Sequence, residues 1–401
     1  MNKYKLKDIC TKIYSGGTPS TKEPKYWGGN IPWLSSSESG KDFIYETDNY
    51  ISNLALKETS TKYVSKNTVI IATAGEGKTR GQVSYLKIGA CINQSLIALE
   101  TDAKKVDSLF LYYYLKNSYS RIRSLSNATG IRGSLSGARL KELIVFIPDV
   151  SEQLKISDLL YKLDLKIQNN KKQIEILETL AKTIYDYWFV QFDFPNEEGK
   201  PYKSSGGKMV WNEELKREIP EGWRCIKLCN IFSFIKGKIP QKLLEQKEPS
   251  LEQYITIDVA NGGTPLYCLP ALMPYCNSET IMVMDGAASG DVYVGIDGVL
   301  GSTFSMLKSK REDISNSYIY LILNSLKKIY KKANTGSTVP HANRKYIENM
   351  VIALPNDCKF LSRKFDEIYA QIKLQKLLIK NLNSLKSFLL PLLMNGQVII
   401  K

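Results

Sequence analysis

Histidine and paired cysteine are nearly missing from this sequence. His341 is the only histidine among 401 residues, and the seven cysteines include no CxxC pair. An odd number of scattered cysteines does not form a disulfide framework, and a structural zinc site needs closely grouped ligands. We therefore expect reduced cysteines and no bound metal, and one imidazole leaves little scope for acid–base catalysis. The cysteines are Cys10, Cys91, Cys225, Cys229, Cys268, Cys276 and Cys358.

Motifs of nucleotide-binding and methylating enzymes are also missing. The sequence has no Asn/Asp-Pro-Pro-Tyr/Phe motif and no glycine fingerprint between a strand and a helix. Residues 72–79 end in the Gly-Lys-Thr of a phosphate-binding loop, but Ala72 replaces the first glycine and residues 80–83 lack a helical period. We interpret this segment as a turn with basic side chains, and we expect the chain to bind no cofactor of its own.

Long hydrophobic runs are the third absence. No stretch is expected to have the apolar length needed to cross a bilayer, and residues 1–5 lack the apolar core of a secretory signal. These two observations predict a cytoplasmic protein without membrane contact.

Positive charge is present in excess. The net charge of +15 and the isoelectric point near 9.2 favour a polyanionic partner, with nucleic acid ahead of membrane lipid. The excess is not confined to a tail, because residues 1–150 carry 21 basic and 13 acidic side chains and residues 223–354 carry 15 and 11. A chain of this length is too long for one ordinary core, so we expect two basic domains.

The two halves share a succession of segments, which indicates an internal repeat. Each half has a Lys-Leu-x-x-Ile pattern, a strand-like apolar run before a glycine turn, an aromatic helix-like segment, and a strand closed by proline. In that order, the matching segments are residues 5–9 and 227–231, 68–71 and 280–283, 109–115 and 317–323, and 144–148 and 350–355.

A long amphipathic helix is predicted after each of these prolines. The two helices superpose at an offset of 205 residues, and their apolar residues recur at steps of three and four, the period of a coiled coil. Leu180 and Leu385 are one matching pair of positions. The residues expected to pair the helices are Leu163, Ile167, Ile174, Leu177 and Ile184 in the first and Ile368, Ile372, Ile379, Leu382 and Leu389 in the second.

Antiparallel pairing of these helices would carry the two domains to opposite ends. From Leu160 to Ile184 the stripe spans about 36 Å at about 1.5 Å per residue, comparable to the separation of DNA half-sites one turn apart. Asn170 and Gln375 interrupt the stripe at similar places, as register-fixing residues would. Ordinary amphipathic core helices are the alternative, and Pro391 predicts an early end or a kink in the second helix.

Polar loops in each half are the candidates for nucleic-acid contact. Lys, Arg, hydroxyls and backbone amides bind phosphates, whereas bases are read by side chains projected into a groove. The alternative for single cations is a solvated surface, and for Trp27 and Trp33 it is packing beneath their glycine turns. The candidates are Thr18, Ser20, Lys22, Ser36, Lys78, Thr79, Arg80, Arg132 and Arg139 in the first half, and Lys236, Lys238, Ser289, Ser337, His341, Asn343 and Arg344 in the second.

Several segments together resemble the specificity subunit of type I restriction-modification enzymes, over essentially the whole chain. GGTPS at residues 16–20 with YWGGNIPWL at 26–34 is similar to the opening of many of that family's target-recognition domains. PDVSEQ at 148–153 resembles the entry to its first conserved helix, and residues 188–194 and 219–223 resemble its inter-repeat segment. The second helix entry, residues 355–360, departs from the first because it lacks the Glu-Gln pair.

The resemblance implies a noncatalytic subunit that recognises a bipartite site in double-stranded DNA. Two modification subunits would dock against the paired helices and methylate adenine with S-adenosylmethionine. Restriction (motor-nuclease) subunits would cleave unmodified DNA with ATP and magnesium, and these cofactors would be held by the partners. A self-contained DNA-modifying enzyme and a coiled-coil scaffold remain the alternatives.

The predicted fold class is α+β, with two similar β-rich α/β target-recognition domains, two long antiparallel coiled-coil helices between them, and an internal pseudo-two-fold repeat. We interpret the segment between the first helix and the second domain as turns without regular structure. The predicted boundaries are 1–150 for the first domain, 151–190 for the first helix, 191–222 for the linker, 223–356 for the second domain and 357–395 for the second helix.

Overall fold

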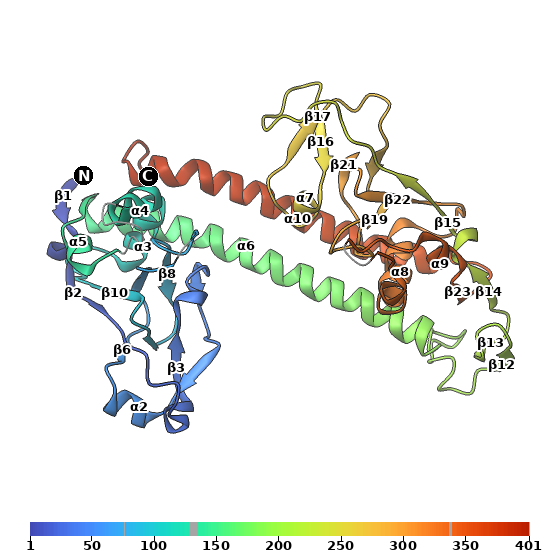
Figure 1. The fold of residues 1–401 in the computed structure, drawn as a ribbon, viewed down its shortest axis with the longest axis horizontal. Coiled ribbons are helices and arrows are strands. Elements are labelled where there is room, and N and C mark those ends of the chain that lie inside the picture. Colours follow the sequence, from blue (N-terminus) through green and yellow to red (C-terminus); the bar gives the residue numbers. More distant parts are fainter. Residues whose placement is uncertain (76, 128–134, 337–338, 401) are drawn as a thin grey trace. The chain divides into compact units, whose positions relative to one another are not determined.

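The computed structural model describes residues 1–75, 77–127, 135–336 and 339–400 and divides the chain into two compact units (Figure 1). Unit 1 comprises Met1–Gln168 with Lys380–Lys401, and unit 2 comprises Asn169–Ile379. Two long helices contribute residues to both units, namely α6 (Val150–Tyr185) and α10 (Lys359–Met394).

Unit 1 combines short strands and helices with the start of α6. One sheet has the strand order β2-β10-β7-β8-β4, a second has β5-β3-β9-β6, and β1 pairs with β11. The elements are β1 Asn2–Lys5, α1 Leu6–Ile9, β2 Cys10–Ser15, β3 Trp27–Leu34, β4 Phe43–Ile44, β5 Asn49–Ile51, α2 Asn53–Glu58, β6 Lys62–Val64, β7 Val69–Ala72, β8 Val83–Leu86, β9 Ala90–Ile92, β10 Leu96–Thr101, α3 Ser108–Asn117, α4 Tyr119–Asn127, α5 Gly137–Lys141 and β11 Ile144–Ile147.

Unit 2 repeats this plan. One sheet has the order β15-β22-β19-β20, a second has β17-β16-β21-β18, and β14 pairs with β23. The elements are β14 Arg224–Lys227, β15 Phe232–Lys236, β16 Glu252–Ile255, α7 Ile257–Ala260, β17 Leu266–Cys268, β18 Tyr275–Asn277, β19 Thr280–Val283, β20 Val292–Tyr293, β21 Asp297–Leu300, β22 Phe304–Ser309, α8 Asn316–Tyr330, α9 Arg344–Asn349 and β23 Val351–Leu354.

The strand pairing confirms the internal repeat. In unit 1, β3 and β9 are parallel, and the antiparallel strands β5 and β6 flank them. In unit 2, β16 and β21 are parallel, and the antiparallel strands β17 and β18 flank them. The aromatic segments predicted as helices are α3 and α8, which occupy corresponding places in the element order.

Burial on both faces explains the uninterrupted apolar runs at β7 and β19. Val69 and Ile71 join the cluster that includes α3, whereas Ile70 joins a second cluster on the opposite face. Met282 and Ile281 are divided between two clusters in the same way. A strand covered on both sides needs apolar residues at every position, and each full burial of such a side chain contributes roughly 1.5–3 kcal/mol.

The two long helices contact each other within each unit. In unit 1, Leu389 and Leu393 of α10 share a hydrophobic cluster with Leu160 of α6. In unit 2, the reverse ends meet, because the cluster contains both Tyr185 of α6 and Phe365 of α10. Each unit thus contains one end of each helix.

The stripe residues are buried to different degrees. Ile167 and Ile372 are 6% and 2% exposed, whereas Leu180 and Leu385 are 46% and 45% exposed, because the steps of four and three pass through the buried Ala181 and Lys386 instead. The remaining residues predicted to pair the helices, all half-buried, are Leu163, Ile174, Leu177, Ile184, Ile368, Ile379, Leu382 and Leu389.

Two polar residues interrupt this stripe without complete hydrogen bonding. Asn170 is 1% exposed, and its amide nitrogen has no partner among the described residues. The side-chain oxygen of Gln375 is likewise buried without one in the described part of the chain. Such groups weaken helix pairing, which fits a role in fixing register better than a role in stability.

The expectation of a linker without regular structure was wrong. The linker forms a hairpin of β12 (Met209–Asn212) and β13 (Arg217–Pro220), because Val210 and Ile219 pair across a turn that contains no glycine. α6 also continues into a π-helical turn at Asp186–Val190. Helix α10 does not end at Pro391 but continues to Met394, since proline removes only its own N–H donor.

Helix α10 also corrects the expectation about apolar length. By length and composition alone, it could cross a membrane. Its apolar end instead packs inside unit 1, where Leu393 and Met394 are 1% and 2% exposed. Lys386 in the same stretch forms a 2.5 Å ion pair with Asp164, while only 17% of the apolar window as a whole is buried.

Candidate nucleic-acid interface

In unit 1, predicted contact residues from separate loops meet at the turn between β9 and β10. Thr18 hydrogen-bonds Gln94, and Ser36 accepts a 3.5 Å hydrogen bond from Asn93. The backbone N–H of Thr73 donates to the carbonyl of Ser95 at 2.8 Å, which joins the turn after β7 to the same place. Sequence reasoning missed Asn93 and Gln94, although a polar triplet between two apolar strands was the available signal.

The glycine loop before β3 is held by its tryptophans. The indole N–H of Trp33 donates to the carbonyl of Gly17 at 3.2 Å, and that of Trp27 donates to the carbonyl of Ser20 at 3.0 Å. The two rings meet edge to face with centroids 5.1 Å apart. The tryptophans therefore pack with their own loop, and this packing leaves Ser20 and Lys22 exposed at its surface.

The turn after β7 does not have the geometry of a phosphate-binding loop. Residues 77–82 form a turn that leads directly into β8, so no helix N-terminus lies beneath Lys78 and Thr79. The hydroxyl of Tyr119 on α4 donates to the carbonyl of Lys78 at 2.8 Å. Lys78 thus lies exposed on a braced turn, and Arg80 is half-buried in it.

Arg132 and Arg139 were both predicted to contact nucleic acid, and the structure describes only the second. Arg132 lies outside the described residues. Arg139 is half-buried, and its guanidinium donates to the carbonyl of Leu125 near the end of α4 at 2.7 Å. The contact satisfies a carbonyl in the last turn of a helix, so we assign Arg139 a structural role in addition to its predicted one.

In unit 2, the turn after β19 and the loop before α9 are tied together. Asp285 and His341 form a backbone bridge, and the Asp285 carboxylate lies 2.7 Å from Nδ1 of His341. The N–H of Gly286 donates to the carbonyl of Pro340 at 2.9 Å, and His341 exchanges backbone hydrogen bonds with Thr335. The imidazole is therefore fixed in position while about half of it stays exposed.

Ser289 supports this arrangement from inside. Its side chain is 1% exposed and accepts a 2.8 Å hydrogen bond from Asn334. Nearby, Asp291 binds Lys327 and Lys331 at 2.7 and 2.6 Å. Burial would raise the pKa of Asp291, but hydrogen bonds from the two lysines bring it below its usual value.

The other predicted residues of unit 2 lie on or near these two hydrogen-bonded loops. Lys236 and Lys238 are exposed at and after the end of β15. Asn343 caps α9 by accepting from the backbone of Tyr346, and Arg344 pairs with Glu348 at 2.8 Å. Ser337 lies outside the described residues.

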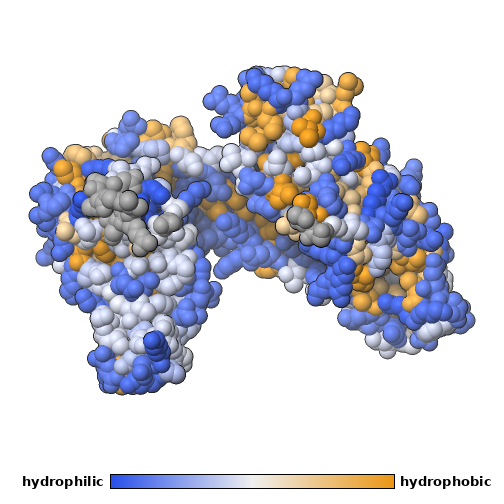
Figure 2. All heavy atoms as spheres, viewed as in Figure 1, coloured by the Kyte–Doolittle hydropathy of each residue, from blue (hydrophilic) through white to orange (hydrophobic). Residues whose placement is uncertain are grey.

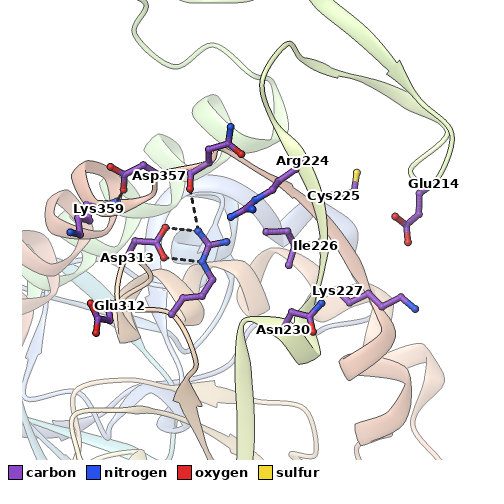
Figure 3. Close-up of a pocket in the computed structure, with 12 residues that line it drawn as sticks. Glu214, Arg224, Cys225, Ile226, Lys227, Asn230, Glu312, Asp313, Asp357 and Lys359 are labelled. Atoms are coloured by element: carbon purple, nitrogen blue, oxygen red, sulfur yellow. Dashed lines mark hydrogen bonds and ion pairs between the residues drawn. The ribbon is translucent and has the colours of Figure 1, made fainter.

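Another group of charged side chains lines a surface hollow of unit 2 (Figure 3). Arg311 holds Asp313 through hydrogen bonds of 2.8 and 2.5 Å, and Asp313 also accepts the N–H of Cys358 at 3.1 Å. The ion pair thereby fastens the start of α10 to the loop after β22. Burial raises the pKa of Cys225 in this hollow, so its thiol is not an activated nucleophile.

The chemistry of these sites is that of binding. Burial also raises the pKa of Cys10, Cys276 and Cys358, each to about 12, which leaves these thiols protonated and unreactive at neutral pH. The loops instead offer cations, hydroxyls, amides and one oriented imidazole on braced turns. These groups bind phosphates and base edges.

Comparison with known proteins gives concordant matches. A family described as the Type I restriction modification DNA specificity domain matches residues 1–179 and 220–385. The Type I restriction enzyme MjaIX specificity subunit of Methanocaldococcus jannaschii is 28% identical over 418 residues, covering 98% of this chain and 92% of that protein. The EcoR124I/EcoR124II specificity subunit of Escherichia coli is 28% identical over 193 residues, 47% of each chain.

The fold has a counterpart among solved structures. The crystal structure of a Type-I restriction-modification system S subunit from M. genitalium aligns with a TM-score of 0.64 at 20% identity. The alignment covers 98% of this chain and 94% of that chain. This likeness concerns the fold and spans both units.

Proposed function

This chain belongs to the family of type I restriction-modification DNA specificity domains and is a DNA sequence-specificity subunit, and we propose that its two units each read one part of a bipartite duplex site. The supporting observation is the repeated topology, in which a parallel strand pair flanked by antiparallel strands recurs in both units. Each copy bears braced polar loops, built around Asn93 in unit 1 and His341 in unit 2. Two similar readers suit a target with two specified parts.

We further propose that α6 and α10 form an antiparallel coiled coil that sets the gap between the two parts. The contacts of opposite helix ends within each unit support this arrangement. The gap would then be fixed by helix length, at about 1.5 Å per residue.

Exposed leucines on the helices support docking of modification subunits. Leu180 in unit 2 and Leu385 in unit 1 occupy matching repeat positions and are exposed to nearly the same extent, 46% and 45%. Single exposed leucines are common, but exposure at both members of a repeat-related pair is what two equivalent docking sites would require. Among the exposed apolar residues of the two helices, this pair is related by the repeat, and one equivalent position in each unit fits the expected pair of modification subunits.

The chemistry would reside in these partners. The modification subunits would bring S-adenosylmethionine and methylate adenine, and restriction subunits would use ATP and magnesium to cleave unmodified DNA. The chain itself would remain noncatalytic and would work in the cytoplasm, where its DNA target lies.

Mapping methylated adenines in the source genome tests the bipartite proposal. A motif of two specified parts with a constant gap is expected, and deletion of this chain's gene should remove it. A single continuous motif would contradict two separate readers.

Assays of the purified chain separate the alternatives. Methyl transfer should require an added modification subunit, whereas transfer by the chain alone would indicate a self-contained enzyme. Binding to the mapped duplex should weaken steeply with salt, because lysine and arginine contacts displace counterions. A chain that shows no binding to the duplex would be a scaffold instead.

A further inference from the structure

An apolar tip projects from unit 2 beside its predicted contact residues. We define it as Ile239, Leu243, Leu269 and Leu272, which are 78%, 41%, 60% and 95% exposed. Figure 2 shows hydrophobic residues gathered among hydrophilic ones at the end of unit 2 that bears β16 and β17 in Figure 1. Single exposed leucines are common, but several on adjoining loops mark a contact surface.

Leu272 is also conformationally unusual. Its φ of +57° lies in the left-handed region, which costs free energy for an L-residue with a bulky side chain. Its side chain does not offset this free energy by packing in the core, because it is almost fully exposed. A strained backbone that presents an apolar side chain to solvent points to a contact outside the unit.

The loop that carries Leu272 is firmly anchored. The next residue, Met273, turns inward and packs against the cluster that includes Tyr254 and Val299. The backbone N–H of Met273 donates to the carbonyl of Pro270 at 3.1 Å. The ammonium of Lys238 donates to the carbonyl of Leu272 at 3.0 Å, which links the loop to the segment that carries Ile239.

The charge around the tip suits a nucleic-acid partner. Residues 236–248 carry four exposed lysines against two glutamates, and residues 266–277 carry no charged side chain. The exposed lysines are Lys236, Lys238, Lys242 and Lys247. The lysines could bind the phosphates of a DNA duplex while the apolar tip contacts its stacked bases, because phosphates border the bases along each strand.

We propose that Leu272, supported by Ile239, is a wedge that inserts between stacked base pairs of the DNA bound by unit 2. Leucine and isoleucine are among the side chains that unstack base steps and bend a duplex. The wedge would make recognition depend on how easily the local sequence deforms. This inference rests on the proposed DNA-reading function, and it gives Lys238 a positioning role for the Leu272 loop in addition to any phosphate contact.

The test uses the full chain with the duplex mapped above, carrying 2-aminopurine at successive positions of the part read by unit 2. Fluorescence of this base analogue increases when it is unstacked. We expect a several-fold increase at one step with the natural protein, and loss of most of it with Leu272→Asn. Asparagine tolerates the left-handed conformation and is close in size, so the loop should keep its fold.

Leu272→Met should retain the increase, since methionine is also an effective wedge. Ile399→Asn, a change at another aliphatic residue that is 71% exposed, is the matched control and should leave the signal intact. Circular dichroism and thermal melting should show that Leu272→Asn folds as the natural protein does.

The possible failures are distinguishable. Natural protein that binds the mapped duplex without any fluorescence increase, or Leu272→Asn that keeps the full increase, would overturn the wedge and leave the DNA-reading function standing. Loss of modification-subunit binding by Leu272→Asn with an unchanged increase would make the tip a protein-docking surface. Absence of specific DNA binding by the natural protein would overturn the proposed function itself.

Discussion

Among single residues, Asp285 fixes the orientation of His341, whose side chain is the only imidazole in the sequence. Its carboxylate binds Nδ1 of His341, so the ring cannot rotate freely and Nε2 is the nitrogen left to meet a ligand. Sequence reasoning named His341 but not its contact with Asp285, since the two lie 56 residues apart and only the fold brings them together.

We expect Asp285→Asn to reduce discrimination between bases more than it reduces overall affinity. The released ring would lose its orientation, and one well-placed base contact is worth about 1–3 kcal/mol of discrimination. The measurement is the ratio of dissociation constants for the mapped duplex and duplexes with single substitutions. Asp297→Asn, at the 2.7 Å pair with Lys373, is the control, and an unaltered ratio in Asp285→Asn would contradict the assignment.

Two basic residues of unit 1 should behave differently on substitution. Arg139→Ala should lower the free energy of unfolding by about 1–2 kcal/mol, since it removes a charged hydrogen bond to the carbonyl of Leu125. Lys78→Ala should leave stability unchanged but reduce the slope of log K against log salt by about one, as expected for a lost phosphate contact. Urea unfolding and salt titration would distinguish them, and the opposite pattern would reverse the two roles.

At the scale of elements, the helices of unit 1 share a buried polar group that unit 2 does not repeat. Lys386 pairs with Asp164, which also accepts a 2.7 Å hydrogen bond from the hydroxyl of Tyr113. Burial and the Asp164 charge raise the pKa of Tyr113 far above its usual value, so its hydroxyl remains a donor. At the corresponding positions in unit 2, 205 residues away, the helices have Tyr369 and the buried Ala181.

Asp164→Leu alone should destabilise unit 1 by about 3–5 kcal/mol, because it leaves the Lys386 charge buried without a partner. The triple change with Lys386→Met and Tyr113→Phe should recover most of that loss, since packed apolar groups often replace a buried ion pair at little cost. Thermal or urea unfolding measures both.

Asp158→Ala is the control for the buried pair, because its pair with Lys162 is exposed and should contribute less than about 1 kcal/mol. A triple variant no more stable than Asp164→Leu would show that the polar group is essential to the packing of these helices.

The attachment of α10 in unit 2 should be sensitive to acid. Hydrogen bonds from Arg311 hold the pKa of Asp313 below its ordinary value of 3.8. A carboxylate with a lowered folded pKa stabilises the protein above its ordinary pKa, and this stability is lost as the pH falls through the folded value.

Asp313→Asn should therefore cost about 1–3 kcal/mol at neutral pH and flatten the loss of stability that sets in as the pH falls below about 4. Unfolding by urea at a series of pH values would show this. Parallel curves for the variant and the natural protein would contradict the role of the ion pair.

The repeat was predictable because it lies in local patterns, while the contacts that close each unit were not. Every residue of β7 and β19 is buried, so each strand appears in the sequence as an uninterrupted apolar run. The aromatic residues of α3 and α8 likewise identify these helices locally. The parallel pairs β3-β9 and β16-β21 join distant segments without a local signal. Leu180 was placed in the helix stripe although steps of four and three from Leu177 to Ile184 pass through Ala181, which is the buried residue.

For the loops, residue types could be predicted but not their accessibility. Ser289 and His341 belong to the same pair of hydrogen-bonded loops, yet Ser289 is buried and His341 is half exposed. Only the completed fold shows this difference in exposure. Leu272 was missed because leucine at a left-handed position has no sequence signature. Asn93 and Gln94 were passed over because a short polar segment between two strands usually forms only a turn.

For the molecule as a whole, Leu180 and Leu385 predict two equivalent attachment points. Leu180→Asp and Leu385→Asp should each reduce the number of bound modification subunits from two to one, and the double variant should bind none, because a carboxylate is costly to bury in an apolar contact. Mass photometry of the assembled complex would count the subunits. Exposed Tyr187→Asp is the control, and retention of both subunits by the double variant would place the docking surface elsewhere.

Unit 1 is formed from two separate segments of the chain, which affects the order in which the units can fold during synthesis. Leu160 lies in a core that Leu393 and Met394 complete, although the whole of unit 2 separates them along the chain. Unit 2, by contrast, is one continuous stretch that ends at Ile379 and can form earlier. The core of unit 1 therefore closes only after unit 2 has been synthesised, so its apolar residues are exposed to aggregation or chaperone binding during that interval.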